Sequence, residues 1–129
     1  MKPQQDSLFT SEMMRGTGQL DMLASISELN QRKAELKRTT HTFWEDPGHG
    51  WLEVSYADLR LLGIWGQISG YSYRRDDKVY LEEDMDAVTY LKAIWGNLRT
   101  EEYKSWQRMY FRTEYRDNIF IRNLKHYKP

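Results

Sequence analysis

A short loop of turn-forming residues, Asp46-Pro47-Gly48-His49-Gly50, constrains the fold of this chain more than any other feature. It lies between residues 40–45 and 51–54, two candidate strands rich in threonine, aromatic and β-branched residues. Proline fixes φ at the first turn position, and the two glycines supply φ values that other residues resist. The pattern therefore predicts a β-hairpin.

A second hairpin is predicted around Asp76-Asp77, between candidate strands at 71–75 and 78–83. A two-residue turn there places Tyr73 opposite Tyr80. Because Asp-Asp is a poorer turn than Asp-Gly, a longer loop with a shifted register stays open.

Helices are predicted after each hairpin. Ser55 can cap a short helix that Gly63 ends, since a serine hydroxyl accepts from free N–H groups and glycine adopts the left-handed conformation. A wide apolar stripe over 87–95 predicts a second helix that ends at Gly96.

The remaining C-terminal residues carry weaker patterns. A helical turn is predicted at 101–106, followed by strand-like segments at 108–116 and 119–124 and by coil at 125–129. Short hairpins between helices are typical of an α+β domain. We expect a small antiparallel sheet of short hairpins with two or three packed helices.

The N-terminal part has a different pattern. Residues 1–19 lack periodicity and are predicted to be a flexible segment, whereas 20–38 carry apolar residues on one stripe and are predicted to form an amphipathic helix extension. A homodimer through residues 20–38 is conceivable on this pattern. Residues 39–129 are expected to form a single α+β domain.

Composition excludes several classes of protein. The 129 residues include no cysteine, which removes disulfides, thiolate nucleophiles and the common structural zinc sites. No apolar run is long enough to span a membrane, and the start lacks a secretion signal, so a cytoplasmic protein with no membrane contact is expected. The formal net charge is zero, so no global field draws the chain to nucleic acid.

The acidic residues of 82–86 invite a Mg²⁺ or Ca²⁺ site, because carboxylates suit these ions. Strand alternation sends Glu82 and Glu83 to opposite faces, and Asp84 or Asp86 can instead cap the next helix. We therefore expect no metal at this cluster.

The one histidine-carboxylate group of the sequence consists of His41, Glu45, Asp46 and His49, with His41, Glu45 and His49 as its central residues. A metal-dependent hydrolase built on them is the weakest hypothesis, because no established catalytic motif accompanies them. We expect no catalytic residue, no metal and no cofactor.

Aromatic and charged residues gather at the two hairpins. Trp, Tyr and Arg are the usual anchors of protein interfaces, so a partner-binding surface is predicted there. Its candidate residues are Trp44, His49, Trp51, Tyr71, Tyr73, Arg74 and Arg75.

A nucleic-acid interface is the alternative. Residues 41–100 hold 6 basic and 10 acidic side chains, whereas 101–129 hold 7 and 4. Cations that neutralise phosphates, interleaved with aromatics that stack on bases, are typical of single-strand binding. The candidate residues are Arg108, Tyr110, Arg112 and Arg116, with alternate residues on one face of the expected strand.

The segments HTFWEDPGHGWLEVSYADLRLLGI, ISGYSYRRDDKVYLEEDMDA and IRNLKHY occur in this order between residues 41 and 127. In this respect the chain resembles a small uncharacterised protein family of bacteriophages, conjugative plasmids and other mobile elements. The resemblance implies an accessory protein of a bacterial host cell but carries over no activity and no site residue. Such proteins often block a host protein, so a non-enzymatic inhibitor of a host defence complex, of anti-restriction or anti-CRISPR type, is the expected function.

Overall fold

The computed structural model describes the backbone of residues 17–129 and the side chains of residues 25–129. The chain divides into two units, Met1–Ala34 and Glu35–Pro129. Helix α1 (Thr17–Leu36) provides the described part of the first unit and includes the first two residues of the second, so the helix predicted at 20–38 is present with slightly different ends. Most of the segment predicted to be flexible, 1–19, lies outside the described residues. Self-association through the helix stays a prediction.

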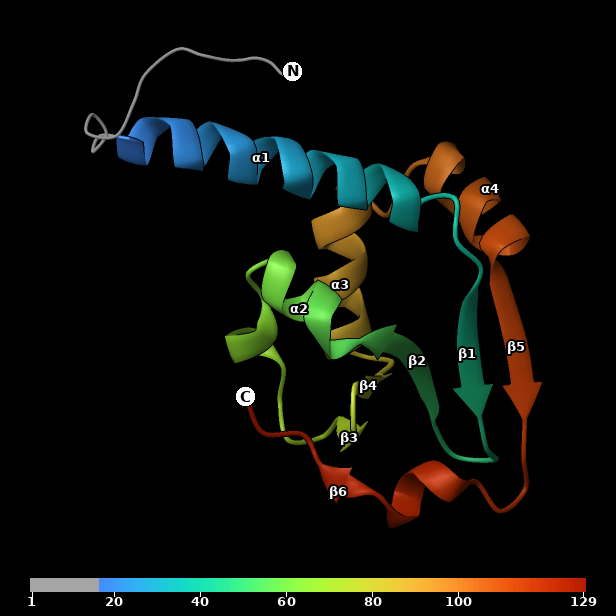
Figure 1. The fold of residues 1–129 in the computed structure, drawn as a ribbon. Helices are drawn as coiled ribbons and strands as arrows, with labels where there is room; N and C mark the ends of the chain where they lie inside the picture. Colours follow the sequence, from blue (N-terminus) through green and yellow to red (C-terminus); the bar gives the residue numbers. More distant parts are fainter. Residues whose placement is uncertain (1–16) are drawn as a thin grey trace. The chain divides into compact units, whose positions relative to one another are not determined.

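Six strands form one sheet in the order β5-β1-β2-β4-β3-β6 (Figure 1). They are β1 (His41–Glu45), β2 (Gly50–Ser55), β3 (Tyr73–Arg75), β4 (Lys78–Glu82), β5 (Phe111–Tyr115) and β6 (Lys125–His126). The α+β class is confirmed. The prediction of an antiparallel sheet is wrong, because β5 runs parallel to β1 while the other neighbours are antiparallel. A parallel pair joins segments far apart in the chain, which local hairpin signals do not reveal.

Both predicted hairpins are present. The first pairs Trp44 with Trp51, and the second has a two-residue turn in which Tyr73 pairs with Tyr80 as expected. Asp76 adopts a φ of 54°, a left-handed value that aspartate tolerates better than most residues. The register left open by the sequence is thus the two-residue one.

In the second unit, cap and turn residues define both ends of one helix and the C-terminal end of another. Helix α2 (Tyr56–Leu61) is capped by the Ser55 hydroxyl, which accepts from the Asp58 N–H at 3.1 Å. Gly63 follows it with a φ of 74°, and Gly96 follows α3 (Asp86–Trp95) with a φ of 101°. These predicted helix ends are confirmed. Within residues 17–129, no helix is long and apolar enough to cross a membrane.

Helix α4 (Glu101–Tyr110) is longer than predicted. The strand expected from residue 108 begins only at Phe111, so that boundary is wrong. The reason is tertiary packing: Trp106 stacks on Trp95 at 5.4 Å between ring centroids, and its indole N–H donates to the Lys37 carbonyl at 2.7 Å. These contacts stabilise the helical conformation, which outweighs the preference of the following aromatic residues for a strand.

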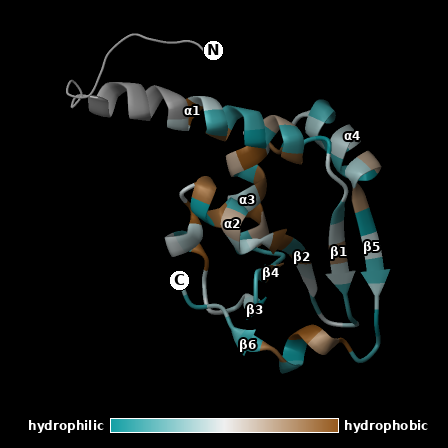
Figure 2. Cartoon of the chain, in the orientation of Figure 1, coloured by the Kyte–Doolittle hydropathy of each residue, from teal (hydrophilic) through white to brown (hydrophobic). Residues whose placement is uncertain are grey.

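One face of the sheet packs against α2, α3 and α4. Leu52 and Leu81 from the central strands are fully buried there with Leu59 of α2 and Ile94 of α3. Hydrophobic residues are concentrated in α3, whereas the edge strand β5 is largely hydrophilic (Figure 2). This core is what fixes the orientation of the strands.

The other face is covered by the chain itself. Residues 116–124, named here the crossing segment, run from β5 at one edge of the sheet to β6 at the other and include the 3-10 helix η2 (Phe120–Asn123). Ile119 and Ile121 are buried against Trp51 and Tyr80. The strand predicted at 119–124 is therefore wrong, because the sheet face offers these residues apolar contacts and no free ladder.

The prediction of coil at 125–129 is wrong for its first two residues, while 127–129 have no regular secondary structure. Lys125 and His126 form β6 beside β3, and the next residue, Tyr127, is buried and donates its hydroxyl proton to the Trp65 carbonyl at 2.6 Å. Since this pairing involves residues more than 50 positions apart, it leaves no pattern in the local sequence.

Candidate functional site

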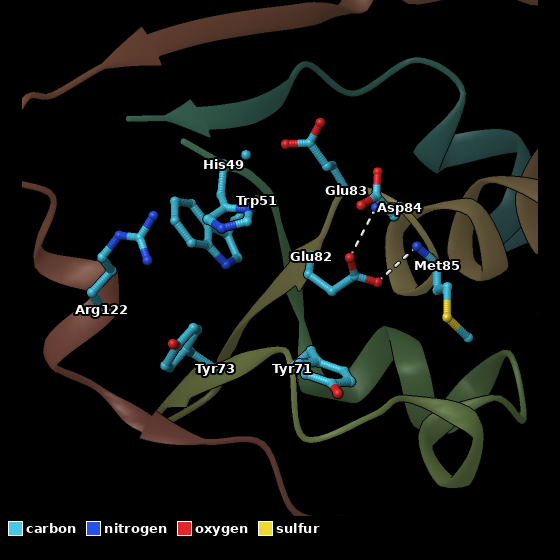
Figure 3. Close-up of a pocket in the computed structure, with 10 residues that line it drawn as sticks. His49, Trp51, Tyr71, Tyr73, Glu82, Glu83, Asp84, Met85 and Arg122 are labelled. Atoms are coloured by element: carbon cyan, nitrogen blue, oxygen red, sulfur yellow. Dashed lines mark hydrogen bonds between the residues drawn. The ribbon is translucent and has the colours of Figure 1, made fainter. Parts of the chain in front are cut away.

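A hollow of about 330 Å³ lies beside the ends of both hairpins (Figure 3). We call it the Trp51 hollow. Its lining residues are His49, Gly50, Trp51, Tyr71, Tyr73, Glu82, Glu83, Asp84, Met85 and Arg122. Four of the seven residues predicted to bind a partner therefore meet in one place, two of them from each hairpin region of the chain.

Trp51 and Tyr73 form the aromatic wall of the hollow. Their rings meet edge to face with centroids 6.3 Å apart, and the His49 ring lies 6.1 Å from Trp51. Strand alternation explains the arrangement, because Trp51 pairs with Glu82, and Tyr73 pairs with Tyr80 two residues earlier on β4. Trp51 itself is only 3% exposed, so its ring is a buried part of the wall.

Glu82 ends β4 and precedes α3, which begins at Asp86. Its carboxylate accepts from three successive backbone N–H groups, those of Asp84, Met85 and Asp86, at 2.9, 2.7 and 2.9 Å (two of these bonds are drawn in Figure 3). The prediction that Asp84 or Asp86 caps α3 is wrong, since the Glu82 carboxylate accepts from the Met85 and Asp86 N–H groups at the helix start and the Asp86 side chain bonds to Ser69 and Ser72 instead. Its carboxylate is therefore occupied, while Glu83, Asp84 and Met85 stay exposed at the rim.

Asp86 is nearly completely buried and organises the loop before β3. Its Oδ2 accepts from the Ser69 N–H at 3.1 Å, the Ser69 hydroxyl at 2.7 Å and the Ser72 hydroxyl at 2.6 Å. The Ser72 hydroxyl oxygen in turn accepts from the Glu82 N–H at 3.0 Å. Tyr71 lies between these two serines and keeps 77% of its surface exposed. The exposed Tyr71 ring thus belongs to a loop whose conformation is stabilised by buried hydrogen bonds to Asp86.

Arg122 closes the hollow from the crossing segment. Both Nε and Nη2 donate to the buried Asp46 carboxylate, and the guanidinium lies 5.2 Å from the centroid of the Trp51 ring. Asp46 also accepts from the Gly48 and His49 N–H groups at 2.9 and 2.8 Å. The Arg122 hydrogen bond, helped by these N–H groups and opposed by burial, holds the pKa of Asp46 well below its ordinary value. Asp46 is therefore ionised, and its hydrogen bonds link the hairpin loop to the crossing segment.

The other three predicted partner-binding residues lie elsewhere. Trp44 packs edge to face on Phe120 of the crossing segment at 5.1 Å, and Arg75 lies 4.9 Å from the centroid of the same ring. Arg74 lies over the ring of Tyr56 at 3.7 Å. Trp44, Arg74 and Arg75 are thus engaged in contacts of the fold outside the Trp51 hollow.

The expected nucleic-acid strand is not formed as predicted. Arg108 and Tyr110 lie on α4, so they do not alternate with Arg112 along one strand face. Arg112 and Arg116 both pair with Glu114, at 3.5 and 3.3 Å. Both arginines are thus engaged with one carboxylate, which offsets one of their two positive charges within the protein.

The three residues of the hydrolase hypothesis have separate roles. His41 is buried and hydrogen-bonds to the Tyr90 hydroxyl at 2.8 Å and the Thr39 carbonyl at 2.9 Å. It begins β1, whereas Glu45 ends that strand and His49 lies in the following loop. In the described part of the chain, no three His, Asp or Glu side chains are placed to hold a metal ion.

Two residues of the hollow lay outside the sequence predictions. Arg122 is 76 positions from its partner Asp46, and no local pattern connects them. Met85 lies between Asp84 and Asp86 in the acidic cluster, and it is 64% exposed and contributes apolar surface to the rim. A methionine between carboxylates, directly before an apolar helix, is the signal that the sequence offers.

The chain matches no protein-family model, no curated protein and no solved structure. The resemblance to a mobile-element family therefore stays a prediction.

Proposed function

We propose that this protein acts by protein-protein contact through the Trp51 hollow and carries out no reaction of its own. The observation that carries the proposal is the rim, where Tyr71 is 77% exposed and Met85 is 64% exposed. Aromatic residues and methionine are enriched in the buried centres of protein interfaces. A rim held by Asp86 and Glu82 also loses little conformational freedom on binding, which favours affinity.

The charge of the rim indicates the character of the partner surface. Glu83 and Asp84 are exposed beside Tyr71 and Met85, whereas the charge of Arg122 is balanced by Asp46. A partner that offers a basic side chain and an apolar contact complements this rim. In line with the resemblance to mobile-element proteins, we propose a subunit of a host defence complex as the partner.

The experiment compares three forms of the full chain in affinity capture from bacterial lysates with and without defence systems. The test variant is Tyr71→Ala with Met85→Ala. The matched control is Tyr115→Ala with Met109→Ala, which removes a tyrosine and a methionine that are 51% and 73% exposed outside the hollow.

We expect the wild type and the control to retain one stoichiometric host protein that the test variant loses. With the purified partner, loss of the two anchor residues should raise the dissociation constant by roughly 30-fold or more. A single interface hot spot contributes about 2 kcal/mol, which corresponds to a factor of roughly 30. Absence of any stoichiometric partner, or equal capture by the test variant, contradicts the proposal.

A further inference from the structure

A second cavity, separate from the Trp51 hollow, lies at the edge of the sheet where β3 pairs with β6. It has a volume of about 790 Å³ and is lined by Arg74, Asp76, Lys125, His126 and Lys128. We call it the β3–β6 cleft; it shares no lining residue with the Trp51 hollow. Three of its five lining residues are cations and one is a carboxylate.

The register of β3 and β6 places two cations against each other. Arg74 pairs directly with Lys125, and the only other pair between these strands is Tyr73 with His126. Like charges directly opposite each other destabilise an antiparallel pair. Half of the pairing of β6 is therefore unfavourable for folding, which is typical of positions retained for function.

The structure does not neutralise these cations internally. The Arg74 guanidinium donates to the Asp76 backbone carbonyl at 2.9 Å and lies over the Tyr56 ring, contacts that orient it without cancelling its charge. No ion pair among the described side chains involves Arg74, Lys125 or Lys128. Arg112, Arg116 and Arg122, by contrast, each pair with a carboxylate.

The wall of the cleft is fixed in position. The Nδ1–H of His126 donates to the Gly70 carbonyl at 2.6 Å, and its ring stacks on Tyr73 with centroids 4.7 Å apart. Lys125 and Lys128 are exposed beside it, so both ammonium groups can reach a ligand from the C-terminal residues.

We propose that the β3–β6 cleft binds the phosphate groups of a nucleic-acid backbone. Several uncompensated cations along an open strand edge suit a ligand with a row of negative charges. The residues that line the cleft include no Phe, Tyr or Trp on which a base can stack, so contact is with phosphate and independent of sequence. This site is distinct from the arginine-rich strand expected from the sequence, because it uses Arg74, Lys125 and Lys128.

The test measures fluorescence anisotropy of a labelled 20-base-pair DNA with the full chain between 25 and 200 mM salt, roughly the range in which phosphate contacts weaken. With three contributing cations, the slope of log affinity against log salt should be about −2.7, from about −0.9 per phosphate contact. The variant Lys125→Gln with Lys128→Gln should reduce the size of that slope by about 1.8.

The matched control is Lys92→Gln with Lys104→Gln, two exposed lysines on α3 and α4 that give the same change in net charge. It should keep the wild-type slope. A third variant, Lys125→Glu, replaces the like-charge pair with an opposite-charge pair. It should weaken DNA binding while the urea midpoint of unfolding stays the same or rises, which separates loss of binding from loss of folding.

Three results overturn the proposal. The first is no salt-dependent DNA binding by the wild type, and the second is an equal loss of binding in the Lys92 and Lys104 control. The third is a competition in which a polyglutamate peptide of 20 residues displaces the labelled DNA at concentrations where unlabelled DNA of the same length does not. That result would assign the cleft to an acidic protein segment.

Discussion

Replacement of Asp86 by alanine tests whether buried hydrogen bonds hold the rim of the Trp51 hollow. Asp86 is 1% exposed, and three donors from Ser69 and Ser72 converge on its Oδ2. Alanine leaves all three without their acceptor. Because Ser72 is 0% exposed, its hydroxyl is closed to bulk solvent and loses its acceptor within the protein interior.

The expected loss of stability follows from the exposure of each donor. A completely buried donor left without a partner costs about 1–3 kcal/mol, and the two half-buried Ser69 donors lose about 0.5–1 kcal/mol each. The sum is about 3 kcal/mol, a large part of the roughly 5–15 kcal/mol that stabilises a typical domain. Asparagine is the matched control: its amide oxygen can occupy the position of Oδ2 and accept the same donors, so Asp86→Asn should cost about 1 kcal/mol.

Urea unfolding followed by tryptophan fluorescence measures both variants. With a slope of about 2 kcal/mol per molar urea, Asp86→Ala should lower the midpoint by roughly 1.5 M and Asp86→Asn by roughly 0.5 M. A midpoint of Asp86→Ala within about 0.3 M of the wild type, or equal losses in the two variants, refutes the reasoning.

Two further predictions concern the first hairpin. A Cβ on Gly50 would lie 2.4 Å from the Phe43 ring, so Gly50→Ala should destabilise the protein by about 1–3 kcal/mol in urea unfolding. A Cβ on Gly48 would lie 3.5 Å from its nearest neighbour, so the control Gly48→Ala should cost less than half as much. Equal costs in the two variants would be evidence against the Gly50 contact. The pKa of Asp46 lies below its ordinary value of 3.8, so its contribution is fully present above that pH and is lost as the pH falls toward the folded-state pKa. The stability difference between the wild type and Asp46→Asn should therefore shrink below about pH 4, and two parallel pH curves would contradict the assignment.

Local signals in the sequence were reliable wherever one residue decides the backbone. Ser55 caps α2 through its hydroxyl, and Gly63 and Gly96 end helices with positive φ, as their chemistry predicts. The pairing of Tyr73 with Tyr80 follows in the same way from a two-residue turn. These features depend on groups within a few positions of one another.

The candidate site was predictable only in part, because its residues meet through strand pairing and long-range contacts. His49, Trp51, Tyr71 and Tyr73 were identified by residue type, but the hollow that joins them also needs Arg122. The cap of α3 was assigned to the wrong carboxylates, since the direction of the Glu82 side chain depends on where β4 ends.

The sequence by itself determined the class of fold, the two hairpins, both ends of α2 and the C-terminal end of α3, because turn, cap and periodicity preferences act over a few residues. Tertiary structure alone decided the parallel pairing of β5 with β1, the length of α4, the crossing segment and the like-charge pair of Arg74 with Lys125. Each of these depends on contacts between segments far apart in the chain. The apolar burial and backbone pairing that such contacts provide outweigh the weak local preferences that the sequence displays.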